Sequence, residues 1–165
     1  FLVFQHSYLV IILKYYRTIY FIMLLPAEIE TKTSIPTLRA LVAKKLIQEH
    51  DYSQKETAEL IGVTQAAISN YLRGTRGNLT SLGDDERVKN MVSQITMMMV
   101  EKYDLSDIIS KFNEACLIIR SSRMLCDTHQ KLEPSLDVDN CHVCEIDYNE
   151  TDSQTSEIVF KTTSE

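Results

Sequence analysis

Apolar side chains recur at steps of mostly three and four residues over positions 34–50, which is the spacing of one face of a helix. Ser34 stands at the start of this stretch, and Pro36 falls in its first turn, where proline is tolerated and presets φ. We therefore predict a helix from Ser34 to about His50. Its apolar face is expected to contain Leu38, Leu41, Val42, Leu46 and Ile47.

Residues 53–74, SQKETAELIGVTQAAISNYLRG, predict two short helices joined by a tight turn. Ser53 and Glu56 have the S-x-x-E spacing of a capping box, in which the side chain of each residue accepts a hydrogen bond from the backbone amide of the other. Gly62 falls where the first helix needs a residue with positive φ. Thr64 is placed to cap the second helix, and Gly74 to end it.

The residue types at three positions suit two short helices that cross steeply. Such a crossing needs a small side chain at the contact, a glycine in the turn and an aliphatic anchor on the second helix. Ala58, Gly62 and Ile68 meet these needs in turn. Helix 34–50 is expected to pack across the pair and to share a core with Leu60, Ile61, Val63, Ile68 and Leu72.

This stretch resembles the helix-turn-helix of Cro/repressor-type (XRE) regulators, which has the same spacing of Gln, Ala, Gly, Val and Ile-Ser. The alternative is a plain helical hairpin that carries a glycine turn. Residues 23–129 also resemble a family of predicted archaeal transcriptional regulators, through the motifs LPAEIE, the 53–74 core and CLIIRSSRMLCDTH. The expected fold is all-α: a Cro/repressor-like helix-turn-helix bundle, two amphipathic helices and a loop-rich cysteine segment.

The polar face of the second motif helix is the candidate DNA-contacting surface. In helix-turn-helix proteins the N-terminal residues of that helix point toward base edges in the major groove. Gln54 matches the phosphate-contacting glutamine of the family that the stretch resembles. The alternative for Ser69 and Asn70 is surface solvation or a local helix bond. Base contacts are expected from Thr64, Gln65, Ala66, Ser69 and Asn70, and phosphate contacts from Gln54, Lys55, Arg73 and Arg76.

Two further amphipathic helices are predicted after this motif. Asp84, Asp85 and Glu86 place negative charge at the start of a helix that runs to about Tyr103, and a second helix follows over 105–121. Two such helices bury little surface alone, so we expect them to dimerise and to pair two recognition helices on one face of DNA. Their apolar positions are Val88, Met91, Val92, Ile95, Met98 and Met99, then Leu105, Ile108, Ile109, Phe112, Cys116 and Ile119.

All four cysteines lie beyond the DNA-contacting part: Cys116, Cys126, Cys141 and Cys144. The pair at 141 and 144 is a C-x-x-C, which lets one tight loop offer two thiolates to a metal. The set suits a four-thiolate site holding Zn²⁺ or, alternatively, an iron–sulfur cluster that would make the protein a sensor. Redox-active or free thiols are the remaining possibility, and His129 and His142 are substitute ligands.

The metal pattern of the archaeal relatives is not intact in this chain. Relatives often carry another cysteine three residues before the one that matches Cys116, and Asn113 stands there in this sequence. The C-x-x-C at 141–144 restores the number of thiols at different positions. The resemblance therefore leaves the geometry of any metal site open.

The 165 residues carry a net charge of −6, distributed as +2 over residues 1–22, +1 over 23–83 and −9 over 84–165. This balance excludes a protein that coats nucleic acid through its overall field, and favours a placed basic patch. Residues 1–22 are rich in Phe, Tyr, Ile and Leu, but Lys14 and Arg17 interrupt them and they lack the features of a signal peptide. We interpret them as upstream sequence translated in frame before Met23, with a membrane anchor or an extra packed helix as the alternatives.

The sequence predicts a cytoplasmic, dimeric, sequence-specific transcription regulator that binds double-stranded DNA, with neither membrane nor small-molecule partners. The alternative is a protein–protein adaptor that docks through the helix-turn-helix and holds a purely structural zinc. No enzyme is expected, because the chain has no Ser-His-Asp arrangement, phosphate loop or H-E-x-x-H. The expected parts are 1–22 (upstream), 23–33 (arm, either an edge strand or irregular), 34–83 (helix-turn-helix), 84–121 (dimerisation), 122–150 (cysteine segment) and 151–165 (disordered tail), with a linker or wing at 74–84.

Overall fold

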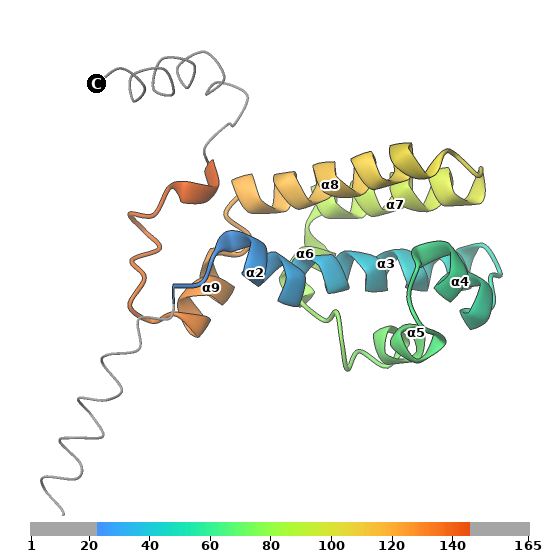
Figure 1. Ribbon diagram of the computed structural model, residues 1–165, viewed down its shortest axis with the longest axis horizontal. Coiled ribbons are helices and arrows are strands. Elements are labelled where there is room, and N and C mark those ends of the chain that lie inside the picture. Colours follow the sequence, from blue (N-terminus) through green and yellow to red (C-terminus); the bar gives the residue numbers. More distant parts are fainter. Residues whose placement is uncertain (1–22, 146–165) are drawn as a thin grey trace, which may run out of the picture.

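The computed structural model describes residues 23–145, and the regular secondary structure within that range is helical throughout (Figure 1). The all-α prediction is confirmed. The expectations for residues 1–22, 146–150 and 151–165 lie outside the described residues. The elements are α2 (Pro26–Lys32), α3 (Ser34–Glu49), α4 (Gln54–Ile61), α5 (Gln65–Leu72), α6 (Thr80–Asp84), α7 (Glu86–Val100), α8 (Leu105–Ser121), α9 (Cys126–Leu132) and the 3₁₀ turn η1 (Val143–Glu145).

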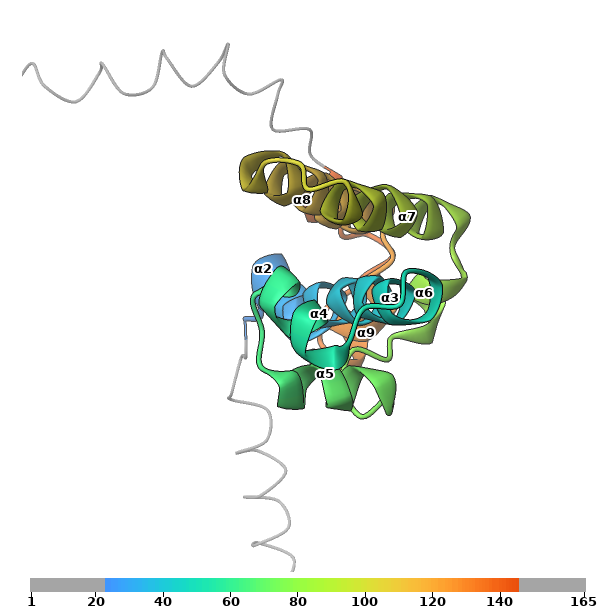
Figure 2. The same cartoon turned by 90° about the vertical axis from the view of Figure 1, so that its right-hand side faces the viewer.

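The helices form two layers around α3. Helices α7 and α8 lie side by side as one layer over α3, while α4 and α5 pack against α3 at one end (Figure 2). Helix α5 lies on the side of α3 that is turned away from the α7–α8 layer. A continuous apolar core joins these layers through buried side chains of α3, α7 and α8, among them Leu38, Val42, Val88, Ile95 and Ile119.

The expected arm at 23–33 is instead mostly helical, so that prediction is wrong. Pro26 occupies the first turn of α2, where its missing N–H costs no hydrogen bond. The Leu25 amide donates to Glu28 Oε2 at 2.9 Å, which satisfies one of the free amides at the helix start. Ile29 is fully buried in the main core. The segment is helical because both its capping and its packing favour a helix.

The linker or wing expected at 74–84 is also replaced by packed structure. The short helix α6 ends this segment, and its Leu82 is completely buried in the main core. Gly77 adopts φ +66° and lies so close to α3 that an added Cβ would stand 2.8 Å from Ala40 Cβ. The segment therefore fixes the end of the helix-turn-helix to α3.

Helices α7 and α8 appear where the periodicity places them, with two differences. Helix α7 stops at Val100 rather than near Tyr103, and Lys102 follows with a left-handed φ of +57°. The apolar face of α8 is buried only from its middle onward: Leu105 and Ile109 are 68% and 58% exposed. The predicted face exists, but in its first two turns only Ile108 is partly buried against the main core, while Leu105 and Ile109 stay exposed.

The cysteine segment contains more regular structure than expected. Cys126 begins helix α9 instead of lying in a loop, and Cys144 lies in η1. Only the part of this segment up to Glu145 is described. Within residues 23–145, none of the helices has the length and apolar content needed to cross a membrane.

Candidate nucleic-acid interface

The turn between α4 and α5 is built by local hydrogen bonds that the sequence encodes. Ser53 Oγ accepts from the Glu56 amide at 3.2 Å, and the Ser53 amide donates to Glu56 Oε2 at 2.9 Å, so the capping box is confirmed. Gly62 has φ +72°, and its amide and that of Val63 both donate to the Ala58 carbonyl at 3.0 Å. Thr64 Oγ1 accepts from the Ala67 amide at 3.2 Å and caps α5.

The buried side of α5 is anchored on α3. Ile68 and Tyr71 are 0% and 1% exposed, and they pack with Ala40 and Ala43 of α3 and with Ala58 of α4. Small side chains on α3 and α4 therefore let the helices approach closely around two large ones on α5. Tyr71 was missed by the sequence analysis, although it follows Ile68 by three residues on the same helix face. Leu60, expected in this core, is 38% exposed because it lies on the side of α4 away from α5.

The opposite side of α5 is free. Thr64, Gln65 and Ala66 are exposed at the N-terminal end of the helix, while Ser69 and Asn70 one turn later are half-buried. The residues expected to contact bases therefore lie on the more exposed side of α5, while the other side of this helix packs on α3 and α4. Helix α5 projects from the body of the molecule at its lower edge (Figure 1).

The side chain of Asn70, unlike that of Gln65, already makes a hydrogen bond to another side chain. Arg73 Nη2 donates to Asn70 Oδ1 at 2.6 Å, and the Asn70 carbonyl accepts from Thr75 Oγ1 at 3.1 Å. The amide oxygen of Asn70 is therefore occupied, and its NH₂ group remains as the available donor. The bond therefore joins Asn70, which is expected to contact a base, to Arg73, which is expected to contact a phosphate.

The residues expected to contact phosphates are exposed at two separate places. Gln54 and Lys55 lie in the first turn of α4, where backbone amides and the helix dipole favour an anion. Arg73 and Arg76 follow the end of α5, and the Arg76 guanidinium carbon lies 6.0 Å from the centroid of the Tyr71 ring. The buried tyrosine thus gives the flexible Arg76 a preferred position.

The family comparison agrees with this geometry. Residues 44–81 match the family model described as helix-turn-helix, from the second half of α3 into α6. Over residues 44–81 the chain is therefore similar to Cro/C1-type helix-turn-helix domains. Members of that family bind DNA, so the role supported for the chain is that of a DNA-binding regulator. No significant match to a curated protein or to a solved structure was found.

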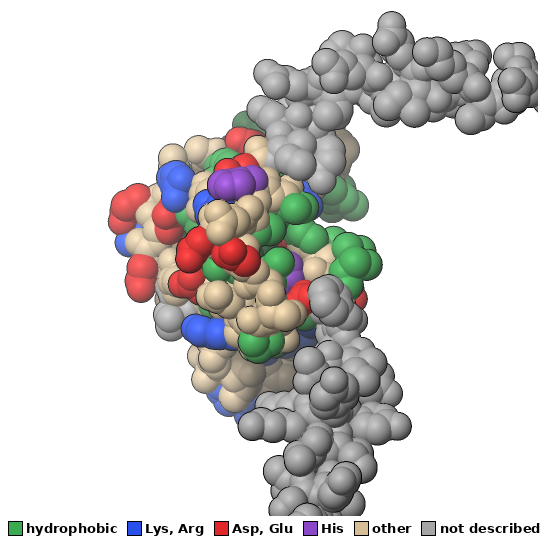
Figure 3. All heavy atoms as spheres, turned by 90° about the vertical axis from the view of Figure 1, so that its left-hand side faces the viewer, with side chains coloured by type: hydrophobic (Ala, Val, Ile, Leu, Met, Phe, Trp, Pro, Cys, Tyr) green, Lys and Arg blue, Asp and Glu red, His purple; other side chains and the backbone are tan. Residues whose placement is uncertain are grey.

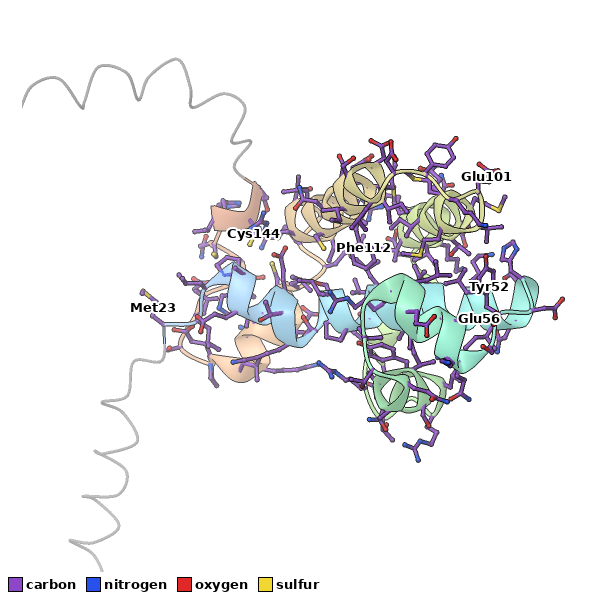
Figure 4. The ribbon with its side chains drawn as sticks, turned by 45° about the vertical axis from the view of Figure 1, so that its right-hand side comes forward. Met23, Tyr52, Glu56, Glu101, Phe112 and Cys144 are labelled. Atoms are coloured by element: carbon purple, nitrogen blue, oxygen red, sulfur yellow. The ribbon has the colours of Figure 1, made fainter. Side chains whose placement is uncertain are left out.

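The four cysteines lie outside the helix-turn-helix domain and do not form one cluster. Cys116 is buried in the main core, and burial raises the pKa of its thiol to about 11. Such a thiol stays protonated and unreactive. Cys126 and Cys144 lie elsewhere, around a small hollow that they share with Arg120 and His129. Figure 4 shows Cys144 at the opposite end of the molecule from Tyr52 and Glu56.

Cys141 belongs with Cys126 and Cys144 rather than with Cys116. The nearby Cys126 and Cys141 both act to raise the pKa of the Cys144 thiol, after the larger effect of its own burial. Within residues 23–145, no three His, Cys, Asp or Glu side chains are already close enough together to hold a metal ion. The structure therefore separates buried Cys116 from the other three cysteines, which lie in one region without forming a metal-binding cluster.

The capping box makes a prediction about pH. Hydrogen bonds from Ser53, first through its side chain and then through its amide, hold the pKa of Glu56 below its ordinary value. A lowered carboxyl pKa stabilises the fold above the unfolded pKa and loses that effect as pH falls through the folded pKa. We expect Glu56→Gln, which keeps an acceptor, to be less stable than the original chain at about pH 6 and to lose that difference at about pH 3. Urea unfolding of both proteins at each pH measures this, and a difference independent of pH would contradict it.

Proposed function

We propose that this DNA-binding regulator recognises specific DNA sequences by placing α5 in the major groove. The observation that carries the proposal is the contrast between the two sides of α5. Ile68 and Tyr71 are buried on one side, while Thr64, Gln65 and Ala66 are exposed on the other. A helix presents base-contacting groups accurately only when its own position is fixed, and α3 provides that support.

The exposed side chains suit different parts of a base pair. Gln65 can pair in a bidentate manner with adenine, and Ala66 is small and apolar enough to meet a thymine methyl group. Thr64 Oγ1 already accepts from Ala67, which leaves its hydroxyl hydrogen to donate to a base or phosphate. Ser69 and the NH₂ group of Asn70 would contact DNA further along the helix. Together these residues form a short polar surface with one apolar contact.

Phosphate contacts would come from both ends of the motif. Gln54 and Lys55 at the start of α4 and Arg73 and Arg76 beyond α5 can reach backbone phosphates on either side of the groove. Three cations neutralise about three phosphates, so the affinity of a single domain should fall with salt at a slope of roughly −3 in log–log form. Because three phosphate contacts give a single domain only modest affinity, we expect two copies of the chain to bind DNA together.

The partner proposed for pairing is a second copy of this chain. A hollow of about 290 Å³ runs between α8 and α4, and it is apolar at its rim, where Leu60, Leu105 and Ile109 are exposed. Phe112 lies on the side of α8 that faces this hollow (Figure 4). The residues that line the hollow belong to α3, α4, α7 and α8, and none belongs to α5. Helix α5 lies below these helices in Figure 2. Pairing through it about a two-fold axis would leave α5 of each copy free to contact DNA.

Two substitutions test the roles assigned to base and phosphate contacts. Sites are first selected from a random oligonucleotide pool, and binding to the selected and a scrambled site is then measured over a range of salt. We expect Gln65→Ala to reduce the difference between the two sites by about 1–3 kcal/mol. Arg76→Ala should weaken both sites alike and reduce the salt slope by about 1.

Gln94→Ala is the matched control, because Gln94 is an exposed glutamine on α7, outside the helix-turn-helix domain. It should change neither quantity. The role assignment fails if Gln65→Ala weakens all sites equally while Arg76→Ala changes discrimination. An adaptor that docks on protein would show no steep salt dependence on nonspecific DNA or heparin.

A further inference from the structure

We propose that Cys126, His129, Cys141 and Cys144 bind a structural zinc ion that fastens residues 122–145 to the helical body. The proposal goes beyond DNA binding and does not depend on it, because none of the four residues lies in the matched segment 44–81. It also differs from a four-thiolate site, since His129 takes the place of Cys116.

The first argument is where these residues lie. Cys126 and His129 on α9 and Cys144 in η1 line one small hollow, closed on other sides by Pro26 and Ile29 of α2. Cys126 and His129 are three residues apart on a helix, so both side chains lie on one face of α9. Cys141 and Cys144 bring a second pair with the same separation from the other side. Two ligand pairs of this kind are the usual construction of a small closed zinc site.

The second argument is the state of His129. Its side chain is only 13% exposed, and its Nε2 atom is buried without any hydrogen-bond partner in the described chain. Glu133 Oε2 lies 3.4 Å from this Nε2 atom, which is an ion-pair distance if His129 is protonated, and it also accepts a hydrogen bond from the Leu24 amide. A buried ring nitrogen without a partner is uncommon in folded proteins and calls for a proton donor or a metal.

The third argument is how the second pair is held. Arg123, itself in a left-handed conformation with φ +61°, donates to the Cys141 carbonyl at 3.0 Å and forms an ion pair with Glu145 at 2.5 Å. It also donates to the Val138 carbonyl. The Arg123 guanidinium thus contacts residues before, within and after the C-x-x-C motif. Neither Cys141 nor Cys144 belongs to the main core.

Residues 133–145 have little apolar packing and little regular secondary structure to hold them against the helices. Val138 is their only buried hydrophobic side chain, at 7% exposed, and their one regular element is a three-residue turn. Figure 3 looks onto this end of the molecule, where acidic and histidine side chains surround small apolar areas. A segment with so little apolar contact is commonly held by a metal or by disulfides.

The ligands are not yet assembled, since no three of them are close enough together to coordinate an ion. Binding of an ion would therefore have to draw the ligands together and release the thiol protons, which couples metal binding to local folding. Zinc with three thiolates and one imidazole carries a net charge of −1. Arg120, which lines the hollow, and Arg123, beside Cys141, place positive charge where that complex would form.

The test uses the full chain purified without oxygen, loaded with Zn²⁺ and, separately, with Co²⁺. Zinc content is measured by mass spectrometry, and thiolate coordination by the visible absorption of the cobalt form. The original chain and Cys116→Ser are expected to bind about one zinc ion per chain. Cys144→Ser and His129→Asn should lose zinc and the visible cobalt bands, while the circular dichroism signal keeps most of its helical intensity, as expected if the helices of residues 23–121 remain.

Cys116→Ser decides between the two ligand sets. Retention of zinc by Cys116→Ser and its loss by His129→Asn support the site. Loss by Cys116→Ser with retention by His129→Asn overturns it in favour of four thiolates. No bound zinc or cobalt in the original chain, or bound iron with a visible cluster spectrum, also overturns it. DNA binding measured on the same samples separates failure of this site from failure of the regulator function.

Discussion

Replacing Gly77 with alanine is expected to destabilise the protein by about 2–4 kcal/mol. Two costs add at this position. Gly77 has φ +66°, a conformation that side chains other than glycine adopt only with strain. The new methyl group would also press on the Pro36 carbonyl and stand 2.8 Å from Ala40 Cβ, so α3 would have to shift. Urea unfolding followed by circular dichroism measures the loss.

Two other glycines separate these costs. Gly74 has nearly the same φ, +69°, but no atom lies within 4 Å of an added Cβ, so Gly74→Ala should cost only about 1–2 kcal/mol. Gly83 lies in α6, and its added Cβ would make an ordinary 3.7 Å contact with Leu41, so Gly83→Ala should be neutral or slightly stabilising. If Gly77→Ala costs no more than Gly74→Ala, the close packing of residues 74–84 on α3 is wrong.

Replacing Ile109 with aspartate is expected to convert the proposed dimer into a monomer. Ile109 is 58% exposed at the rim of the hollow between α8 and α4, so the substitution should leave the monomer folded. In a dimer the carboxylate would be buried against apolar side chains without a partner, which is strongly unfavourable. Loss of pairing should weaken binding to a two-half-site operator by roughly 10²–10⁴-fold. Sedimentation equilibrium and DNA titration measure the two effects.

Leu117→Asp is the matched control. Leu117 is 43% exposed on the same helix, but it does not line the hollow. This variant should keep the oligomeric state and operator affinity of the original chain. If Ile109→Asp remains a dimer, or if both variants dissociate, the hollow is not the dimer interface.

The helix-turn-helix was predictable because its determinants are local. The capping box, the left-handed Gly62 and the Thr64 cap each depend on residues within four positions of one another. Such interactions form in the same way whatever surrounds them. The boundaries of α3 and α8 followed from periodicity for the same reason.

The features that the sequence did not predict depend on which distant surfaces meet. Helical periodicity identifies an apolar face but not what covers it, so it could not distinguish buried Tyr71 from exposed Leu60. In the same way it assigned Leu105 and Ile109 to the apolar face of a helix expected to dimerise, but could not show that both are exposed in the single chain. Helix α2 is different, because Pro26 in its first turn and Glu28 in its capping position were available signals.

The grouping of the cysteines shows the same limit. The sequence analysis assigned all four cysteines to one site because it considered residue type alone. The packing of α8 instead places Cys116 in the main core. His129 was recognisable as a ligand candidate only through its three-residue separation from Cys126. Its position beside Cys144 depends on how α9 packs against α2 and how η1 packs against α8, which no local pattern specifies.

The central claim, that the exposed side of α5 contacts DNA, is tested most directly by placing a negative charge there. Ala66→Glu alters an exposed position on α5 and should leave the circular dichroism and unfolding midpoint unchanged. Affinity for the selected site is measured by fluorescence anisotropy for this variant and the original chain. We predict a loss of about 100-fold or more, because the carboxylate would enter a groove lined by phosphates. Unchanged affinity in the folded variant would contradict the claim.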